Sequence, residues 1–499
     1  MRLLLINPCN RLSSMVKVKE NRWNKYRVWK PLGLLVLAGM TPKEWDITVF
    51  DENLGLPNYA GIPRPDLVGI TAFTSQAPRA YEVAARFRTL GVPVVMGGIH
   101  ATMRPEEALE RVDAVVKGEA EDVWTQVLED AQQHTLKRIY EGSQTDAERI
   151  PIARHELLPN GYFFGSVQAA RGCPLNCSFC SVSAFNGRKY RRRVIEDVVQ
   201  EFRLIPERHI LVVDDNLIGT SPAHIADAKD LFRALIRANL GKKWIAQATI
   251  NMADDEELLE IAAKAGCAGV FIGFESPSEE GLAEVRKKFN SRKGRDFRAS
   301  VRRIQRHGIV VAGSFIVGLD VDKPGIGERI VAAANRYGLD LLNVNCLTPL
   351  PGTDLWNDME AADRIAADEF PEDWKYYTLT LPVGRYKHLS RTDILRELDT
   401  CNRKFYSLAG ILRRTWGWCV GRRKPILALV GNLSNRNNGR LYRKVFQAFA
   451  ASQDGAAHRD STSMVPAAVD TSYSSGARSG AKRPSAATAG GSRVGPEVS

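Results

Sequence analysis

The chain has few cysteines for its length and no long apolar run. Its 8 cysteines in 499 residues are too few for a disulfide scaffold. The longest apolar stretch near the amino terminus, residues 31–40, is too short to cross a bilayer. We expect no signal peptide, because the first apolar residues, 3–6, are followed at once by Asn7 and Pro8. The composition, 44% hydrophobic and 25% charged, is that of an ordinary globular chain of two or three domains.

Two further absences narrow the function. No Ser–His–Asp set and no paired carboxylates stand at spacings that acid–base catalysis would use. The net charge of +12 would suit a nucleic-acid partner, but the sequence contains no recognised RNA-binding module or basic–aromatic repeat. We therefore expect neither ordinary acid–base chemistry nor binding to nucleic acid.

Three cysteines stand together in one short run, RGCPLNCSFC. Cys173, Cys177 and Cys180 can hold three irons of a cubane cluster and leave the fourth iron open to a ligand that is not protein. A structural zinc site would want a fourth Cys or His nearby, and the next histidine downstream is His209. A noncatalytic iron–sulfur carrier stays an alternative, although it would need a fourth cysteine and none is suitably placed. The spacing therefore favours a cluster with one open iron.

The CxxxCxxC pattern, with Phe179 before its last cysteine, resembles the radical S-adenosylmethionine (SAM) superfamily. In that superfamily SAM chelates the open iron, and one electron from the cluster cleaves it to a 5′-deoxyadenosyl radical. The resemblance implies a 4Fe-4S cluster on these three cysteines, SAM as a cofactor, and a low-potential electron donor such as flavodoxin or ferredoxin. Because such a cluster needs a reducing compartment, we expect a cytoplasmic protein.

Residues 1–140 alternate strand and helix patterns, which predicts a Rossmann-like (flavodoxin-like) parallel sheet covered on both faces. The strand candidates are residues 3–7, 46–53, 67–73, 92–98 and 113–119. Ligands of such sheets bind where the strands end. The small and hydroxyl-bearing residues at these ends are Thr71, Thr74, Ser75, Gly97, Gly98 and Gly118.

This first segment resembles the cobalamin-binding domain of one radical SAM subfamily, through VGITAFTSQAPRA, VPVVMGGIHAT and VVKGEAE. The resemblance implies that the strand-end residues bind cobalamin. A DxHxxG element, which supplies a cobalt-ligating histidine in other cobalamin domains, is missing where this chain reads NPCNRLSS. We favour a structural or tail-contacting role for His100 over ligation of cobalt. A sheet that holds no corrin is the alternative.

Residues 155–375 contain six further strand candidates, which predict a partial (β/α)6 TIM-like barrel. They are residues 166–172, 209–216, 243–251, 269–276, 310–318 and 341–353. The resemblance places SAM near Asp214, Asp215, Asn216, Glu275, Ser276, Gly313 and Gly318. Carboxylates after strands are also frequent helix N-caps, which is the structural alternative. Gln247, Asn251, Asn343 and Asn345 are candidates for the substrate pocket.

The end of the chain divides into a basic helical region, residues 376–450, and a tail, residues 451–499, whose composition predicts disorder. Between residues 400 and 445 basic and large apolar side chains are interleaved, which suits peripheral contact with a membrane surface. A helical cap on the barrel mouth with a basic outer face is the favoured alternative. The charge run Lys189, Arg191, Arg192 and Arg193 could face the cluster, a cofactor carboxylate or solvent.

The combined resemblance implies a cobalamin-dependent radical SAM enzyme, a C-methyltransferase acting on an unactivated carbon of a lipid or natural product. A radical cyclase, oxidase or carbon–carbon bond-forming enzyme with the same cofactors is the alternative. A methylthiotransferase is disfavoured, because that family places further cluster cysteines in its first domain and Cys9 stands alone here. The cofactors, and not acid–base side chains, would perform the difficult chemistry.

Overall fold

The computed structural model describes residues 1–10, 12, 29–287, 295–421 and 425–455. Contacts divide the chain into a compact unit, Met1–Ala450, and a second unit, Ala451–Ser499. The predicted disordered tail lies outside the described residues, apart from the end of the last helix. Among the described helices, none is both long and apolar enough to cross a membrane.

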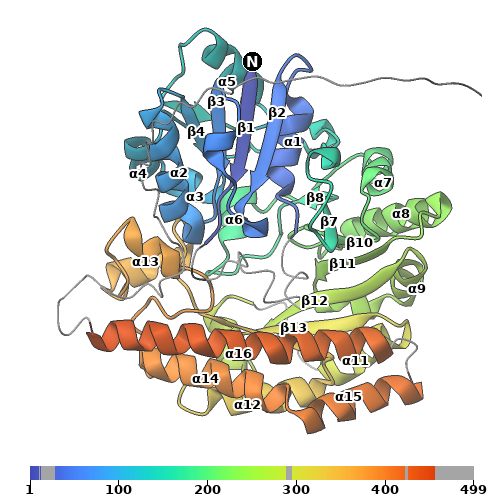
Figure 1. Ribbon diagram of the computed structural model, residues 1–499. Helices are drawn as coiled ribbons and strands as arrows, with labels where there is room; N and C mark the ends of the chain where they lie inside the picture. Colours follow the sequence, from blue (N-terminus) through green and yellow to red (C-terminus); the bar gives the residue numbers. More distant parts are fainter. Residues whose placement is uncertain (11, 13–28, 288–294, 422–424, 456–499) are drawn as a thin grey trace, which may run out of the picture. The chain divides into compact units, whose positions relative to one another are not determined.

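The first sheet has six parallel strands in the order β2-β1-β3-β4-β5-β6, which confirms the flavodoxin-like prediction. Helices α2, α3 and α4 cover one face, and α1 and α5 cover the other (Figure 1). The strands are β1 (Arg2–Asn7), β2 (Asp46–Asp51), β3 (Leu67–Thr71), β4 (Val94–Gly97), β5 (Ala114–Lys117) and β6 (Ile139–Glu141), and the helices are α1 (Leu32–Met40), α2 (Ala77–Thr89), α3 (Ile99–Met103), α4 (Pro105–Arg111) and α5 (Trp124–Gln132).

Strand β1 shows why both faces of this sheet are covered. Its side chains alternate between the two faces, as strand geometry requires. Leu4 and Ile6 pack into the core beneath α2, whereas Leu3 and Leu5 pack into the core beneath α1 and α5. All four are buried. Such a strand is stable only between two layers of helices.

The second sheet also has six parallel strands, in the order β14-β13-β12-β11-β10-β7, and confirms the partial barrel. Because β7 and β14 do not pair with each other, the barrel stays open between them. The strands are β7 (Phe164–Val167), β10 (His209–Val212), β11 (Lys243–Ala248), β12 (Cys267–Glu275), β13 (Val310–Val317) and β14 (Leu341–Cys346), and the helices are α7 (Ile195–Leu204), α8 (Pro222–Ala238), α9 (Glu256–Lys264), α10 (Glu279–Glu284), α11 (Phe297–Arg306) and α12 (Ile326–Tyr337). A hairpin, β8 (Ala170–Arg171) and β9 (Arg191–Arg192), and helix α6 (Ser181–Asn186) stand between β7 and α7.

A segment after the barrel returns to the first domain. Helix α13 (Asp354–Ala361) and the 3-10 helix η8 (Glu372–Tyr376) pack against the α2 face of the first sheet. Trp356 and Trp374 are buried there with Ala80 and Phe87. The predicted boundary at residue 375 is therefore not a boundary in the packing, since part of the segment 155–375 completes the core of the first domain.

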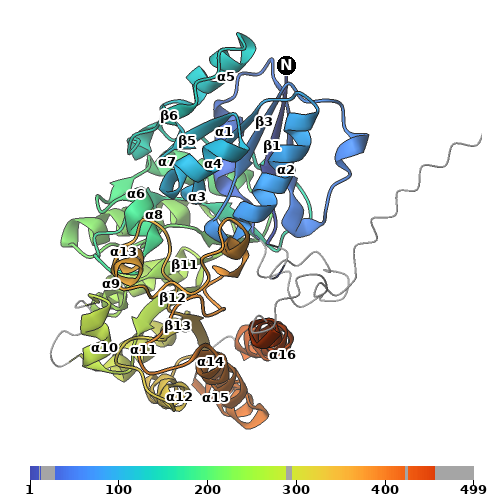
Figure 2. The ribbon, with the colours of Figure 1, turned by 90° about the vertical axis from the view of Figure 1, so that its left-hand side faces the viewer.

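Three helices, α14 (Arg391–Phe405), α15 (Leu408–Gly421) and α16 (Pro425–Gly455), follow in the region that was predicted to be helical. The Tyr406 hydroxyl donates to the carbonyl of Leu342 at 2.7 Å and accepts from its amide at 2.9 Å, so it satisfies the free edge of β14. Ala428 packs on Val310 at the start of β13, and Phe449 contacts Tyr376 near the other end. The helices thus cover the side of the barrel that β14 leaves open, and do not only cap its mouth (Figure 2).

Candidate functional site

The three-cysteine loop lies between β8 and α6 at the carboxyl end of the barrel strands. Cys173 is buried, whereas Cys177 and Cys180 are half-buried, and all three thiols are free. The amide of Cys173 donates to the carbonyl of Gly187 at 3.2 Å. No group of three His, Cys, Asp or Glu side chains in the described residues converges as a single ion requires. A cubane binds each thiolate at a different iron, so its ligands do not need to meet at one point.

Gly172 sets the start of this loop. Its φ of +86° is one that L side chains rarely adopt, and a Cβ here would lie 2.1 Å from the backbone oxygen of Lys189. The loop can therefore pass this close to the β8–β9 connection only with glycine at this position. Burial raises the pKa of the Cys177 thiol to about 11, so the metal-free loop is neutral there, and iron must displace the proton.

Asp214 and Asp215 follow β10 and hold the backbone that leads into the cysteine loop. The carboxylate of Asp214 accepts from the amides of Ala169 at 2.6 Å and Ala170 at 2.8 Å. Asp215 accepts from the amide of Gly172 at 2.8 Å. Asp214 is fully buried, and this burial raises its pKa to about 8. These hydrogen bonds explain Asp214 without a ligand, and its contact with SAM stays a prediction.

A buried ion pair stands beside the cysteines. Lys287 Nζ lies 3.1 Å from Glu275 Oε1, and Glu275 ends β12 with a φ of +63°. Burial opposes the charge of Lys287, but Glu275 and the thiols of Cys177 and Cys173 raise its pKa above the usual value. The sequence analysis missed Lys287, since one lysine after a helix carries no periodic signal. Ser276, the next predicted residue, is buried and accepts from the amide of Ser278 at 3.3 Å.

The inner face of the barrel is accessible along several strands. Gln247 on β11 stands opposite Phe271 on β12, which is 39% exposed, and Ser314 on β13 stands opposite Asn343 on β14. Asn343 donates to Asn345 Oδ1 at 3.2 Å. A ligand between the cysteine loop and this face would meet these amide and aromatic groups. The predicted pocket candidates Gln247, Asn343 and Asn345 lie here.

Four other predicted barrel residues do not present a side chain to this inner face. Gly313 would direct a Cβ to the outer face, at 2.3 Å from Leu339 Cδ1, so only its backbone could approach SAM, which stays a prediction. Asn251 is buried against Thr249, and Asn216 donates to the same hydroxyl at 3.4 Å. Gly318, with a φ of +108°, is crowded by the Tyr386 ring, which would lie 2.8 Å from a Cβ.

The carboxyl ends of β1 and β3 meet at the point where the strand order of the first sheet reverses, and this is where ligands of such sheets bind. Thr71 ends β3, and Thr74 and Ser75 begin the next turn, the 3-10 helix η4 (Thr74–Gln76). Gly98 has a φ of +88°, and its Cβ would lie 2.6 Å from Thr71 Oγ1. The structure thus brings these predicted residues together at one edge.

Gly97 and Gly118 need separate explanations. A Cβ at Gly97 would meet only ordinary contacts, the nearest at 3.7 Å from Val116. At Gly118 a Cβ would lie 2.5 Å from the carbonyl of Gly142, and its φ is +84°. The glycine at 118 is therefore explained by packing against the chain after β6, without any ligand.

His100 lies in the core between α3, α4 and the returning segment. Its Nε2 is 2.9 Å from the Tyr81 hydroxyl, its ring meets the Trp374 ring edge-on, and the side chain is fully buried. Burial lowers its pKa despite the hydrogen bond with Glu107. These contacts favour the structural role over ligation of cobalt.

Glu119, just after β5, joins the first domain to the cysteine loop. Its carboxylate accepts from Arg171 Nη1 at 2.9 Å and also pairs with both terminal nitrogens of Arg191. Arg171 on β8 and Arg191 on β9 flank the loop, and all three side chains are buried. Two residues of the charge run are thus internal, Arg191 and Arg193, the latter paired with Glu201 at 2.7 Å, whereas Lys189 is exposed and Arg192 pairs with Asp227 at the surface.

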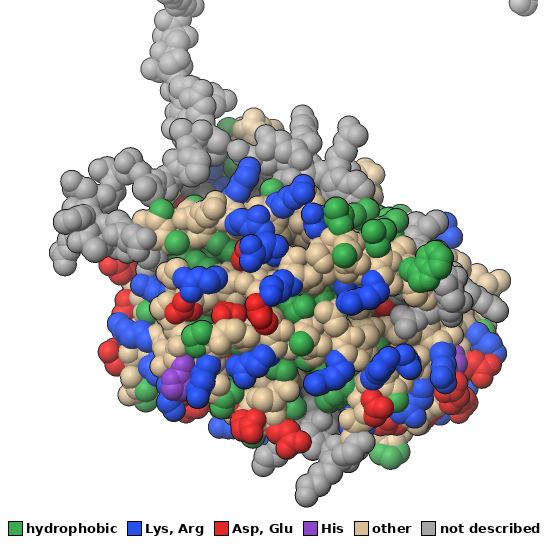
Figure 3. Space-filling view, turned by 90° about the horizontal axis from the view of Figure 1, so that it is seen from below, with side chains coloured by type: hydrophobic (Ala, Val, Ile, Leu, Met, Phe, Trp, Pro, Cys, Tyr) green, Lys and Arg blue, Asp and Glu red, His purple; other side chains and the backbone are tan. Residues whose placement is uncertain are grey.

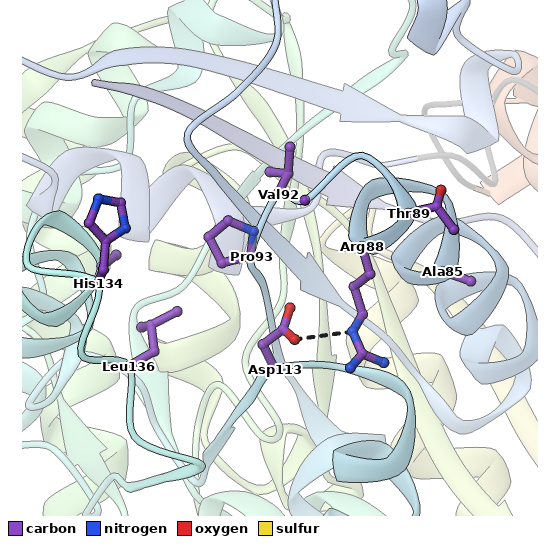
Figure 4. A pocket seen from close by; sticks show the side chains of 10 residues that line it. Ala85, Arg88, Thr89, Val92, Pro93, Asp113, His134 and Leu136 are labelled. Atoms are coloured by element: carbon purple, nitrogen blue, oxygen red, sulfur yellow. Dashed lines mark hydrogen bonds and ion pairs between the residues drawn. The ribbon is translucent and has the colours of Figure 1, made fainter.

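A cavity of about 740 Å³ lies elsewhere in the described structure. Figure 4 shows it at the amino ends of β4 and β5, lined by Arg88, Asp113 and His134, with Arg88 paired to Asp113 at 3.1 Å. Ligands of parallel sheets bind at the opposite edge, so we assign it no part in the chemistry.

Comparison with protein families matches the two halves of this arrangement separately. Residues 25–128 match the B12 binding domain, and residues 167–326 match the radical SAM superfamily. An uncharacterized methyltransferase of Pyrococcus horikoshii is 30% identical over 409 residues, which cover 75% of this chain and 87% of that protein. The chain belongs to the cobalamin-dependent radical SAM enzymes. The predicted cofactors, a 4Fe-4S cluster, SAM and cobalamin, are confirmed, and so is the assignment as a methyltransferase.

Other relatives of this cobalamin-dependent radical SAM enzyme have named activities. The bacteriochlorophyllide d C-12(1)-methyltransferase of Chlorobaculum tepidum is 28% identical over 443 residues, which cover 84% of this chain and 91% of that protein. The hopanoid C-2 methylase of Rhodopseudomonas palustris is 28% identical over 349 residues, which cover 68% and 66%.

Solved structures agree with the fold. The radical SAM methyltransferase TsrM from Kitasatospora setae, with cobalamin and a 4Fe-4S cluster bound, matches with a TM-score of 0.59 at 19% identity over 72% of this chain and 75% of that one. The cobalamin-dependent SAM radical enzyme OxsB, with aqua-cobalamin and SAM bound, matches with a TM-score of 0.61 at 15% identity over 91% and 71%. At these identities the likeness shows the fold alone.

Proposed function

We propose that this enzyme methylates an unactivated carbon of an apolar small molecule, a lipid or a natural product. The observation that carries the proposal is the buried network around Glu119, which fixes the carboxyl edge of the first sheet against the cysteine loop. Cobalamin at the edge of the first sheet and the cluster with SAM at the cysteine loop must act on the same substrate carbon. A rigid connection between the two supports that geometry.

Within the proposal, the cluster is held by Cys173, Cys177 and Cys180. When bound, the cluster with SAM supplies radical abstraction of hydrogen, and cobalamin supplies the methyl group. Asp214, Asp215 and Gly172 orient the loop, as their hydrogen bonds require. Lys287, paired with Glu275, keeps a positive charge beside the thiolates and disfavours an uncompensated buried anion.

The remaining cofactor contacts are proposed from position. Asp215, Asn216, Glu275, Ser276 and Gly318 lie at or after the carboxyl ends of barrel strands, where SAM would lie. Cobalamin would lie at the strand ends of the first sheet, and its proposed contacts there are Thr71, Thr74, Ser75, Gly97, Gly98 and Gly118. Thr71 and Gly98 lie side by side at this edge, and residues this small would let a large ring approach the backbone.

The substrate class is proposed from the accessible barrel face and from relatives. Gln247, Phe271 and Asn343 offer two amides and one ring, which suits an apolar molecule with few polar groups. Named relatives methylate a hopanoid and a bacteriochlorophyllide. A low-potential donor of the flavodoxin or ferredoxin kind would reduce the cluster. A cytoplasmic enzyme that touches the membrane through residues 400–445 would reach such substrates.

The test is methyl transfer under strictly anaerobic conditions. The reconstituted enzyme is incubated with a low-potential reductant, SAM carrying a labelled methyl group, and separate lipid and pigment extracts. We expect the label in an apolar product and deoxyadenosine in stoichiometric amount. Cys177→Ala should abolish both, whereas Cys267→Ala, a buried cysteine outside the loop, should retain both. Transfer of label by the Cys177→Ala variant would overturn the proposal.

A second candidate is a radical cyclisation with the same cofactors. An anaerobic magnesium-protoporphyrin IX monomethyl ester cyclase of Rubrivivax gelatinosus is 25% identical over 411 residues, which cover 73% of this chain. The same assay separates the two functions. Deoxyadenosine formed with a tetrapyrrole, but without any labelled methyl in the product, would favour the cyclase.

A further inference from the structure

The positive charge of the chain is concentrated in its last helices. The chain has 69 Lys and Arg against 57 Asp and Glu, and residues 400–453 contain eleven basic residues but no acidic residue. These eleven account for nearly the whole net charge of +12. They are Arg403, Lys404, Arg413, Arg414, Arg422, Arg423, Lys424, Arg436, Arg440, Arg443 and Lys444, of which residues 422–424 lie outside the described part.

Helix α15 carries large apolar side chains on its outer face. Leu408 is 58% exposed, Leu412 is 67% exposed and Trp416 is 72% exposed. Their spacing of four residues places them in one stripe along the helix. Ile411, which lies beside the stripe around the helix, is buried in the fold. A soluble surface rarely gathers three such side chains in a row without a partner.

Contacts of Arg414 on the inner face of α15 keep this stripe directed toward solvent. Arg414 stacks on the Phe405 ring at 3.9 Å and donates to Asn432 Oδ1 at 2.7 Å, so it ties α15 to α14 and α16. Burial lowers the pKa of Arg414 to about 10. Rotation of α15 about its axis to bury the apolar stripe would therefore break these contacts.

Figure 3 shows the face on which these helices lie. Blue Lys and Arg side chains are spread across it together with red acidic groups, and a group of green apolar side chains stands out near one edge. Basic side chains and exposed apolar side chains thus occur on one face of the molecule.

We propose that the stripe Leu408, Leu412 and Trp416, with exposed Arg413 beside it, is a docking surface for a bilayer that contains anionic phospholipids. Trp416 would sit at headgroup depth, and the leucines would enter the boundary of the acyl chains. Exposed Arg413, with other basic side chains of the region, would face the lipid phosphates. A protein partner would be expected to meet both signs of charge, which residues 400–453 do not offer. The surface binds without spanning the membrane.

Vesicle co-sedimentation with the full chain tests the docking surface. Phosphatidylcholine vesicles with phosphatidylglycerol are compared with phosphatidylcholine alone, at low and high salt. We expect binding to the anionic vesicles that weakens as salt rises. Leu412→Glu/Trp416→Glu should lower the partition coefficient at least about tenfold, because two apolar anchors are lost and two repulsive charges are gained. Leu90→Glu, which is 55% exposed on the first domain, is the matched control and should bind like the wild type.

Other binding partners of this surface would give different results in these binding assays. Equal binding to neutral and anionic vesicles, or unchanged binding by the double variant, overturns the proposal. A concentration-dependent dimer that the double variant abolishes would assign the stripe to a second copy of the chain, and would also overturn it. So would preferential binding of a transfer RNA probe over vesicles. These readouts need no turnover, so they stand apart from the proposed methyl transfer.

Discussion

Glu119 offers the sharpest test of how the two cofactor domains are joined. Its carboxylate side chain is 2% exposed and pairs with Arg171 and Arg191, which are 10% and 6% exposed. Glu119→Gln keeps the shape but removes the charge, and Arg171 then keeps only Glu121 as an ionic partner. Breaking a buried pair by removing one partner costs about 3–5 kcal/mol. Because glutamine retains one acceptor oxygen, we expect a loss of about 3 kcal/mol in the free energy of unfolding.

The assay is urea unfolding of the metal-free protein under reducing conditions. Arg192→Gln is the matched control, since Arg192 pairs with Asp227 on the surface, where both side chains are 37% exposed. An exposed pair of this kind contributes less than about 1 kcal/mol. Adding Arg191→Met to Glu119→Gln should recover part of the loss, because the second change removes the unpaired charge.

The catalytic readout separates positioning from simple stability. If Glu119 fixes the distance between the domains, Glu119→Gln at a temperature where it is folded should form more deoxyadenosine per methyl group transferred than the wild type. A variant that unfolds within 1 kcal/mol of the wild type and couples the two products normally would refute the reasoning.

Three other perturbations have definite outcomes. Gly172→Ala should lower the iron content after reconstitution, because its Cβ would lie 2.1 Å from the Lys189 carbonyl oxygen. Gly241→Ala is the control and should load iron normally, because a Cβ at Gly241, which has a φ of +65°, would meet nothing within 4 Å. Equal iron loading of the two variants would contradict the account of the loop. Tyr406→Phe should cost about 1–3 kcal/mol in urea unfolding, because the buried edge of β14 at Leu342 loses its partner, and no measurable cost would contradict this. Burial raises the pKa of Asp322 from 3.8 to about 6, so its contribution to stability is present below about pH 4 and is lost as the pH rises through 6. Asp322→Asn should flatten that fall in the free energy of unfolding measured from pH 4 to 7, and an identical profile would contradict the assignment.

Most of the main strands were predictable because they are short runs rich in apolar and β-branched residues. Both parallel sheets and the helices between the strands follow from such runs and from turn signals. Strand β6 was missed, since Ile139–Glu141 is only three residues long and has one buried side chain. The cysteine loop was found because its spacing is itself the chemical signal.

The sequence could not show which contacts individual residues make in the tertiary fold. Strand β12 shifts its register against β13 between Gly273 and Glu275, and such a slip, which changes the face that side chains occupy, is not visible in the alternation of the sequence. The carboxyl oxygens of Asp214 accept hydrogen bonds from the amides of Ala169 and Ala170, which are far away in the sequence. Arg191 and Lys287 find carboxylate partners through the tertiary fold alone. Hydrogen bonds and ion pairs that form only in the tertiary fold leave no pattern in the local sequence.

The central claim is that three cysteines of one loop leave one iron open to SAM. Electron–nuclear double resonance on the reduced, reconstituted enzyme, with SAM labelled with oxygen-17 in its carboxylate, tests this directly. We expect coupling between the label and the cluster, and neither cluster nor coupling in Cys177→Ala. A loaded cluster that shows no coupling to SAM in the wild type would contradict the account.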